Sequence, residues 1–182
     1  HLLDCCQESD GAVAMVITSS DRAREMKAKP VYIKAAAQGI SDGQESMTSF
    51  YRQDITGLPE MGHVASQLWQ QSRLTPKDVQ SAVLYDHFSP FVLPQLEEFG
   101  FVKRGEAKDF IRGGEHARGG SLPVNTHGGQ LGEAYIHGMN GIAEAVRQIR
   151  GTSVNQVKDV HNMVVTAGTG VPTSGLILGD RA

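Results

Sequence analysis

Three short segments of this chain combine groups that can move a proton with glycines that let a backbone approach a ligand. The first holds Tyr85 and His87, and the second runs from Asn125 to Gly129 and leads on to Tyr135. The third is Ala167-Gly168-Thr169-Gly170. A phenol can donate or relay a proton, and a neutral imidazole can accept one. We therefore take Tyr85, His87 and Tyr135 as candidate catalytic residues.

Other residues of the same segments are candidates for binding a substrate. Glycine permits close approach of the backbone, and neighbouring N–H groups can then hold a polar or anionic group. The same glycines can also serve tight turns alone, and both interpretations can hold together. The candidate binding residues are Asn125, His127, Gly128, Gly129, Gly168 and Gly170.

Each candidate also has an ordinary structural interpretation. A tyrosine such as Tyr85 or Tyr135 can be a core residue whose hydroxyl bonds to the backbone. A loop histidine such as His87 is often a surface or hydrogen-bonding group. His127 and His137 flank a glycine turn at no known zinc spacing, so we expect no metal site there.

The segments around these residues alternate between strand and helix patterns. Apolar and β-branched runs predict strands, and apolar residues at helical spacing predict helices. The predicted strands are residues 10–19, 31–39, 81–85, 160–166 and 176–178, and the predicted helices are residues 21–29, 60–74, 91–99 and 132–150. This alternation predicts a layered α/β fold whose loops after the strands carry the candidate site.

Two polar stretches lie between the predicted elements. Residues 40–59 are rich in Ser, Asp, Gly and Thr and predict a surface excursion. Residues 101–120 predict a loop with Arg104, Arg112 and Arg118. This second loop either contacts a phosphate or is simply a solvated surface segment.

The composition excludes several classes of protein. The chain has 182 residues, of which 40% are hydrophobic, and a net charge of −3. It therefore lacks the basic field that attracts nucleic acid or acidic lipid. Its longest apolar runs are far shorter than the ~20 residues that a transmembrane helix needs. We expect a cytoplasmic protein with no nucleic-acid or membrane partner.

The beginning of the chain adds two expectations. Cys5 and Cys6 are the only cysteines, and their adjacency disfavours a mutual disulfide and matches no zinc motif. A reducing compartment fits this pattern. His1 leads directly into a structured-looking segment without an initiator methionine, so we expect a piece of a longer chain.

The three segments, in this order and at this spacing, resemble the active-site loops of the C-terminal half of thiolases. The motifs are Tyr85-Asp86-His87-Phe88-Ser89, Asn125-Thr126-His127-Gly128-Gly129 and Ala167-Gly168-Thr169-Gly170. Residues 3–14 are similar to the end of the N-terminal half. The resemblance implies that residues 1–29 end the N-terminal half and that residues 30–182 form the C-terminal thiolase-like domain.

This sequence departs from the thiolase pattern at three positions. Tyr85 replaces the asparagine that holds an oxyanion, and Tyr135 replaces the histidine base of the Gly-His-Pro motif. Thr166 replaces the second cysteine. A threonine hydroxyl is a much weaker acid than a thiol, so ordinary thiolase chemistry is disfavoured.

The altered set most resembles the lipid-transfer-protein-like steroid side-chain-cleaving aldolases of bacterial sterol degradation. That resemblance implies retro-aldol cleavage of a β-hydroxyacyl-CoA ester into a ketosteroid and propionyl-CoA. The CoA thioester is then the substrate, and no covalently bound cofactor is needed. The resemblance also implies a homodimer and a partner protein with a zinc ribbon and an OB-fold. An acetyl-CoA acyltransferase or sterol-carrier-type thiolase is one alternative, and a non-catalytic lipid-binding subunit is another.

Overall fold

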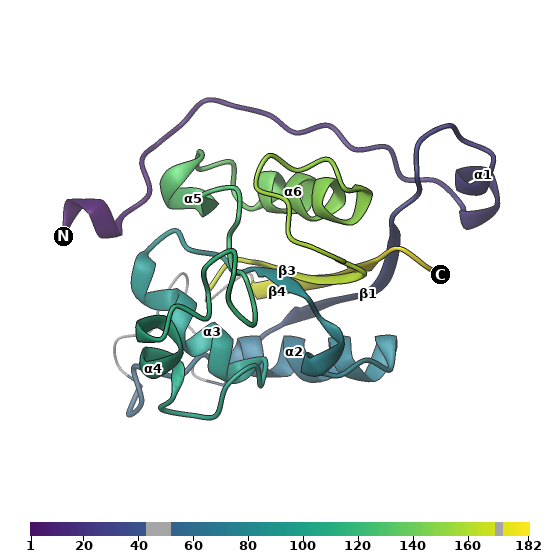
Figure 1. Cartoon of the computed structure of the whole chain (residues 1–182). Coiled ribbons are helices and arrows are strands. Elements are labelled where there is room, and N and C mark those ends of the chain that lie inside the picture. Colours follow the sequence, from purple (N-terminus) through teal and green to yellow (C-terminus); the bar gives the residue numbers. More distant parts are fainter. Residues whose placement is uncertain (43–51, 170–172) are drawn as a thin grey trace.

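A mixed four-stranded sheet forms the middle layer of the protein (Figure 1). The computed structural model describes residues 1–42, 52–169 and 173–182. The strands are β1 (Tyr32–Gly39), β2 (Ser81–Val83), β3 (Asn162–Ala167) and β4 (Thr173–Gly179), in the order β1-β4-β3-β2. β2 and β3 are parallel, whereas β4 is antiparallel to both β1 and β3. Four of the five predicted strands are thus confirmed, with shifts of a few residues at their ends.

Helices cover both faces of the sheet, as the layered α/β prediction requires (Figure 1). One face carries α5 (Gly129–Gly132) and α6 (Met139–Arg150). The other carries α2 (Pro59–Ser72), α3 (Val92–Glu98) and α4 (Ala107–Arg112). The remaining short elements are α1 (Ser20–Arg24) and the 3-10 turns η1 (Leu2–Asp4), η2 (Pro76–Asp78) and η3 (Ser89–Phe91).

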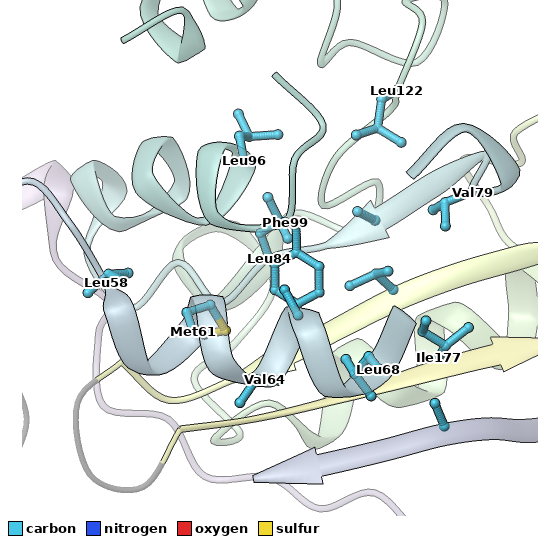
Figure 2. Close-up of a cluster of buried hydrophobic side chains, with 14 of the residues drawn as sticks. Leu58, Met61, Val64, Leu68, Val79, Leu84, Leu96, Phe99, Leu122 and Ile177 are labelled. Carbon is cyan, nitrogen blue, oxygen red and sulfur yellow. The ribbon is translucent and has the colours of Figure 1, made fainter. Parts of the chain in front are cut away.

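The larger core lies between α2, α3 and the sheet (Figure 2). The apolar residues at helical spacing in α2, among them Met61, Val64 and Leu68, are buried there. Leu84 and Phe99 pack into the same cluster and are almost fully buried. Each such side chain contributes roughly 1.5–3 kcal/mol on burial. The end of β2, from which the candidate residue Tyr85 follows, is therefore firmly anchored.

A second core joins α6 to the opposite face of the sheet. It includes Ala145 and Ile149 from α6 and Met163 and Val165 from β3. Gly141 lets α6 approach closely, because a Cβ there would lie 2.6 Å from Val83 Cγ1. The segment that precedes α6 is thereby brought over the ends of β2 and β3.

The predicted strand at residues 10–19 is wrong. This segment is extended but forms no strand, and Val16 and Ile17 are 89% and 77% exposed. It runs past α5 and α6 along the outside of the molecule (Figure 1). An apolar run shows that a segment suits a sheet, but a strand also needs a neighbouring strand for its hydrogen bonds.

Two helix predictions and one loop prediction need correction as well. The predicted helix at residues 21–29 is the short α1, which ends at Arg24. The predicted helix at residues 132–150 begins only at Met139, because His137 and Gly138 have positive φ angles of 50° and 87°. This break leaves Tyr135 between α5 and α6. The predicted loop at residues 101–120 contains α4, whose α3-facing residue Ala107 is buried.

Part of the predicted excursion, residues 43–51, lies outside the described residues, as does the candidate binding residue Gly170. The division of the chain at residue 29 stays a prediction.

A candidate active site at the strand ends

The phenols of Tyr85 and Tyr135 meet at the carboxyl end of β2. The Tyr85 hydroxyl lies 3.1 Å from the Tyr135 hydroxyl and is placed as its donor. Tyr85 is only 5% exposed, whereas Tyr135 is half-buried. Burial, together with the hydrogen bond to Tyr135, holds the pKa of the Tyr85 phenol far above its ordinary value. Tyr85 is therefore a neutral donor at physiological pH.

His87 packs against this pair and is buried. Its ring centroid lies 5.0 Å from that of Tyr85, and the imidazole stacks on Phe91 at 5.1 Å. Burial lowers the pKa of His87 to about 4, so the imidazole is neutral at physiological pH. The Thr169 Oγ1 lies 3.4 Å from Nε2, and Nδ1 has no hydrogen-bond partner among the described residues. A neutral ring with a spare nitrogen can accept a proton or bind a polar group.

Asp86 shapes the glycine turn rather than facing the phenols. Its Oδ1 accepts the N–H of Gln130 at 2.6 Å, and burial raises the pKa of its carboxyl. A Cβ on Gly129 would lie 2.0 Å from Asp86 Oδ2, at a φ of 68°. The neighbouring Gly128 N–H donates to the Asn125 carbonyl at 2.8 Å. The first two candidate glycines thus serve the turn, and a role in substrate binding stays a prediction.

The side-chain amide of Asn125 is directed at the backbone before Tyr85. Its Oδ1 accepts the Leu84 N–H and its Nδ2 donates to the Leu84 carbonyl, both at 2.8 Å. Asn125 itself has a φ of 52°, which asparagine tolerates better than most residues. Through these contacts Asn125 ties the second segment to the first.

His127 lies beneath the glycine turn, with its side chain 3% exposed. Neither ring nitrogen has a hydrogen-bond partner in the described part of the chain. The nearest carboxylate oxygen, Glu133 Oε2, is 3.9 Å from Nε2. Burial lowers the pKa of His127, and the nearby carboxylates oppose that effect. The ring is therefore not accessible from the surface, and only a group that enters the turn can contact it.

The third segment completes the contact between the three loops. A Cβ on Gly138 would lie 3.1 Å from the Ala167 Cβ and 3.5 Å from Tyr85 Cε2. Gly168 follows Ala167 directly and has a φ of 73°. Tyr85, the segment of Tyr135 and the segment of Gly168 therefore lie together, as the sequence predicted.

The beginning of the chain also contributes to this site. The Cys6 N–H donates to the His87 carbonyl at 2.9 Å, and Glu8 forms an isolated β-bridge with Tyr135. Burial raises the pKa of the Cys6 thiol, so this sulfur is protonated and a weak nucleophile. The sequence signal for this contact was only the family resemblance of residues 3–14, because periodicity says nothing about it.

Two further side chains escaped the sequence reasoning as contributors to the site. Gln95 and Thr166 are buried directly behind Tyr85 and bond to its backbone. A glutamine inside a helix and a threonine inside a strand carry no distinguishing pattern, so only the fold identifies them.

The described residues contain no cluster of three or more potential metal ligands from His, Cys, Asp and Glu side chains. None of the helices built from them has the length and apolar character needed to cross a bilayer.

Comparisons with known proteins connect these loops to one family. The family model described as Thiolase C-terminal domain-like matches residues 41–179. A 17-hydroxy-3-oxo-4-pregnene-20-carboxyl-CoA lyase of Mycobacterium tuberculosis is 70% identical over 179 residues, covering 98% of this chain and 46% of that protein. A steroid side-chain-cleaving aldolase of Thermomonospora curvata is 68% identical, covering 100% of this chain and 46% of its own length.

A solved structure gives the same result. The structure of an Ltp2-ChsH2(DUF35) aldolase superposes with a TM-score of 0.96 at 68% identity, covering 100% of this chain and 48% of that one. The chain thus spans about half the length of the proteins that it matches. The fold predicted from its motifs is confirmed.

Proposed function

This chain belongs to the thiolase C-terminal domain-like family, and on that premise we propose that its protein cleaves a β-hydroxyacyl-CoA ester by a retro-aldol reaction. The observation that carries the proposal is that the hydroxyl oxygens of Tyr85 and Tyr135 lie 3.1 Å apart, while the adjacent strand β3 contains no cysteine. A retro-aldol reaction needs proton transfer and charge stabilisation but no covalent nucleophile. The identity of 70% to a carboxyl-CoA lyase supports the same reaction.

The proposed reaction balances without an oxidant or a cofactor. A base removes the proton of the substrate's β-hydroxyl, and the oxygen becomes a carbonyl as the Cα–Cβ bond breaks. The electron pair of that bond forms the enolate of the thioester. Protonation of the enolate carbon then releases the shorter acyl-CoA, so the proton that was removed is returned.

Tyr135 is the proposed group in proton transfer. Because Tyr85 donates its hydrogen to the Tyr135 oxygen, the proton of Tyr135 can point to a ligand instead. Tyr85 remains a donor throughout, since its neutral form is strongly favoured. It can stabilise negative charge that develops on Tyr135 or orient the departing ketone.

His87 is the second group that we propose to take part in proton transfer. Its imidazole is neutral and touches the Tyr85 ring, and Nδ1 is unpartnered among the described residues. The binding of the thioester by Asn125, His127, Gly128, Gly129 and Gly168 is part of the same proposal.

The proposed substrate is a steroid side-chain CoA thioester that yields a ketosteroid and propionyl-CoA. The names of the relatives from Mycobacterium tuberculosis and Thermomonospora curvata support a steroid substrate. We further propose a cytoplasmic homodimer with a zinc-ribbon and OB-fold partner, and the ChsH2(DUF35) component named with the similar aldolase structure supports such a partner.

The experiment is a cleavage assay with the full-length protein, with and without the candidate partner. The substrate is a steroid CoA ester with a β-hydroxyl on its acyl group. The control is the same ester without that β-hydroxyl. We expect the hydroxylated ester alone to give equal amounts of ketosteroid and acyl-CoA by mass spectrometry. Chain shortening that requires added CoA would instead identify a thiolase, and no product from either ester would favour a non-catalytic binding subunit.

A further inference from the structure

Gln95 holds both polar groups of the Tyr85 backbone. Its Nε2 donates to the Tyr85 carbonyl at 2.8 Å, and its Oε1 lies 3.2 Å from the Tyr85 nitrogen as an acceptor. The same Nε2 also donates to the Phe91 carbonyl at 2.8 Å. Gln95 comes from α3 and has no solvent exposure. A helix that packs on the large core is thereby bonded directly to the residue that carries the phenol.

Thr166 closes this arrangement from β3. Its Oγ1 accepts the Tyr85 N–H at 2.8 Å and donates to Gln95 Oε1 at 2.6 Å. Thr166 is 1% exposed, so water does not compete for the hydroxyl. Its only proton is committed to Gln95. Thr166 therefore cannot exchange a proton with a substrate, although it stands where thiolases carry their second cysteine.

We propose that Gln95 and Thr166 form a positioning pair that fixes the Tyr85 backbone and so keeps its phenol within hydrogen-bonding distance of Tyr135. β2 ends at Val83, so the sheet's regular ladder does not hold residue 85. The positioning pair supplies the missing bonds from two different elements. Loss of the Gln95 amide leaves the buried Tyr85 carbonyl without its partner. Loss of the Thr166 hydroxyl leaves the Tyr85 N–H with only the longer contact to Gln95 Oε1, and either loss allows the loop to shift.

This inference rests on the proposed function only where it predicts rates. Active-site geometry is sensitive, because a displacement of about 1 Å in a reacting group can cost on the order of 100-fold in rate. The position of the Tyr85 phenol itself can be followed without any substrate. Its ionisation is suppressed by burial and by its bond to Tyr135, and both depend on where the ring lies.

The test uses four variants of the full-length protein. Thr166→Val keeps the side-chain shape and removes the hydroxyl, whereas Thr166→Ser keeps the hydroxyl and removes the methyl group. Gln95→Met removes the hydrogen bonds to the Tyr85 carbonyl and N–H. Ser81→Ala is the matched control, because this fully buried hydroxyl on β2 donates to the Pro123 carbonyl at 2.8 Å and does not contact the Tyr85 backbone.

Two measurements are made on each variant. The first is kcat and KM for the hydroxylated CoA ester. The second is the pH titration of the Tyr85 phenol by ¹³C NMR of Cζ-labelled tyrosine, with the signal assigned by its loss in Tyr85→Phe. We expect Thr166→Val and Gln95→Met to lose about 10- to 100-fold in kcat with KM within about twofold. Their Tyr85 signal should ionise closer to the ordinary tyrosine range, whereas Thr166→Ser and Ser81→Ala should resemble wild type.

The inference is overturned if the Tyr85 titration in Thr166→Val and Gln95→Met matches that of Ser81→Ala. If the wild-type protein cleaves no ester, the proposed function fails, but the NMR titration still decides whether the pair positions Tyr85. If Gln95→Met does not fold, the comparison of Thr166→Val with Thr166→Ser decides it, because Thr166→Val loses the hydroxyl but keeps the branched shape, whereas Thr166→Ser loses only a methyl group and keeps the hydroxyl.

Discussion

Tyr85 and Tyr135 place their hydroxyl oxygens 3.1 Å apart across 50 residues of sequence. Tyr85 follows a strand whose neighbour Leu84 is anchored in the large core, whereas Tyr135 lies in the break between two helices on the opposite face. The hydrogen bond between them therefore joins the sheet to the helix layer formed by α5 and α6. Variants that remove one or both hydroxyls can therefore show how far the contribution of each phenol to the rate depends on the other.

Tyr135→Phe should lower the rate of retro-aldol cleavage by about 10²–10⁴-fold, the range typical of general acid–base catalysis. The substitution keeps the ring and removes only the hydroxyl. The melting temperature should stay near that of wild type, because Tyr135 is only half-buried. Steady-state kinetics and thermal unfolding of the full-length protein measure both effects. Tyr32→Phe, which removes a tyrosine hydroxyl from β1, is the control and should retain full activity. Wild-type turnover by Tyr135→Phe would remove Tyr135 from the mechanism.

Tyr85→Phe should reduce the rate by a similar or smaller factor, since its phenol acts through Tyr135 or orients the ketone. The double variant Tyr85→Phe/Tyr135→Phe should then be little worse than Tyr135→Phe alone. Groups that act as a unit are non-additive in this way. A double-mutant cycle on kcat/KM measures the coupling. Strictly multiplicative losses would show that the hydrogen bond has no part in the reaction.

Gly129→Ala should destabilise the fold, whereas Gly132→Ala in the same short helix should not. The new Cβ at position 129 would lie 2.0 Å from Asp86 Oδ2 at a positive φ, but nothing lies within 4 Å of one at position 132. Steric crowding and the left-handed backbone together cost about 2–4 kcal/mol. Thermal unfolding should therefore show a clear decrease in the melting temperature of Gly129→Ala only. Equal melting temperatures would contradict the close approach of Asp86 to the turn.

The protein should lose stability on acidification, partly through His87. The pKa of His87 is about 4 in the folded state against an ordinary value of 6.5, so the unfolded chain binds the proton first. The free energy of unfolding therefore falls as the pH drops from 6.5 towards 4, by roughly 3 kcal/mol for a shift of this size. His127, whose pKa is also lowered by burial, acts in the same direction.

His87→Phe should reduce this loss of stability at acidic pH, because it removes one of the two imidazoles whose pKa is lowered by burial. Denaturant unfolding at several pH values between 7 and 4.5 gives the slope for each protein. A variant whose free energy of unfolding falls as steeply as that of wild type would show that His87 is not kept neutral by burial. Activity is not needed for this measurement, so the result is independent of the proposed reaction.

The sequence alone determined the family and the layered α/β class, and it singled out Tyr85 and Tyr135 as candidate catalytic residues. Motifs such as Tyr85-Asp86-His87-Phe88-Ser89 are local, and periodic runs such as that of α2 report which face of an element is buried. Both signals can be seen within a few neighbouring residues. They therefore predicted four of the five strands, and the resemblance of the motifs to thiolase loops predicted that Tyr85, Tyr135 and Gly168 lie close together.

Only the tertiary structure decided which groups face one another. Residues 10–19 have strand composition but lie exposed, since strand formation depends on a partner that composition does not specify. Gln95 and Thr166 look ordinary in the sequence, yet they meet at the Tyr85 backbone across 10 and 81 residues. Burial, too, is a property of the whole fold, and burial is what keeps Tyr85 and His87 neutral.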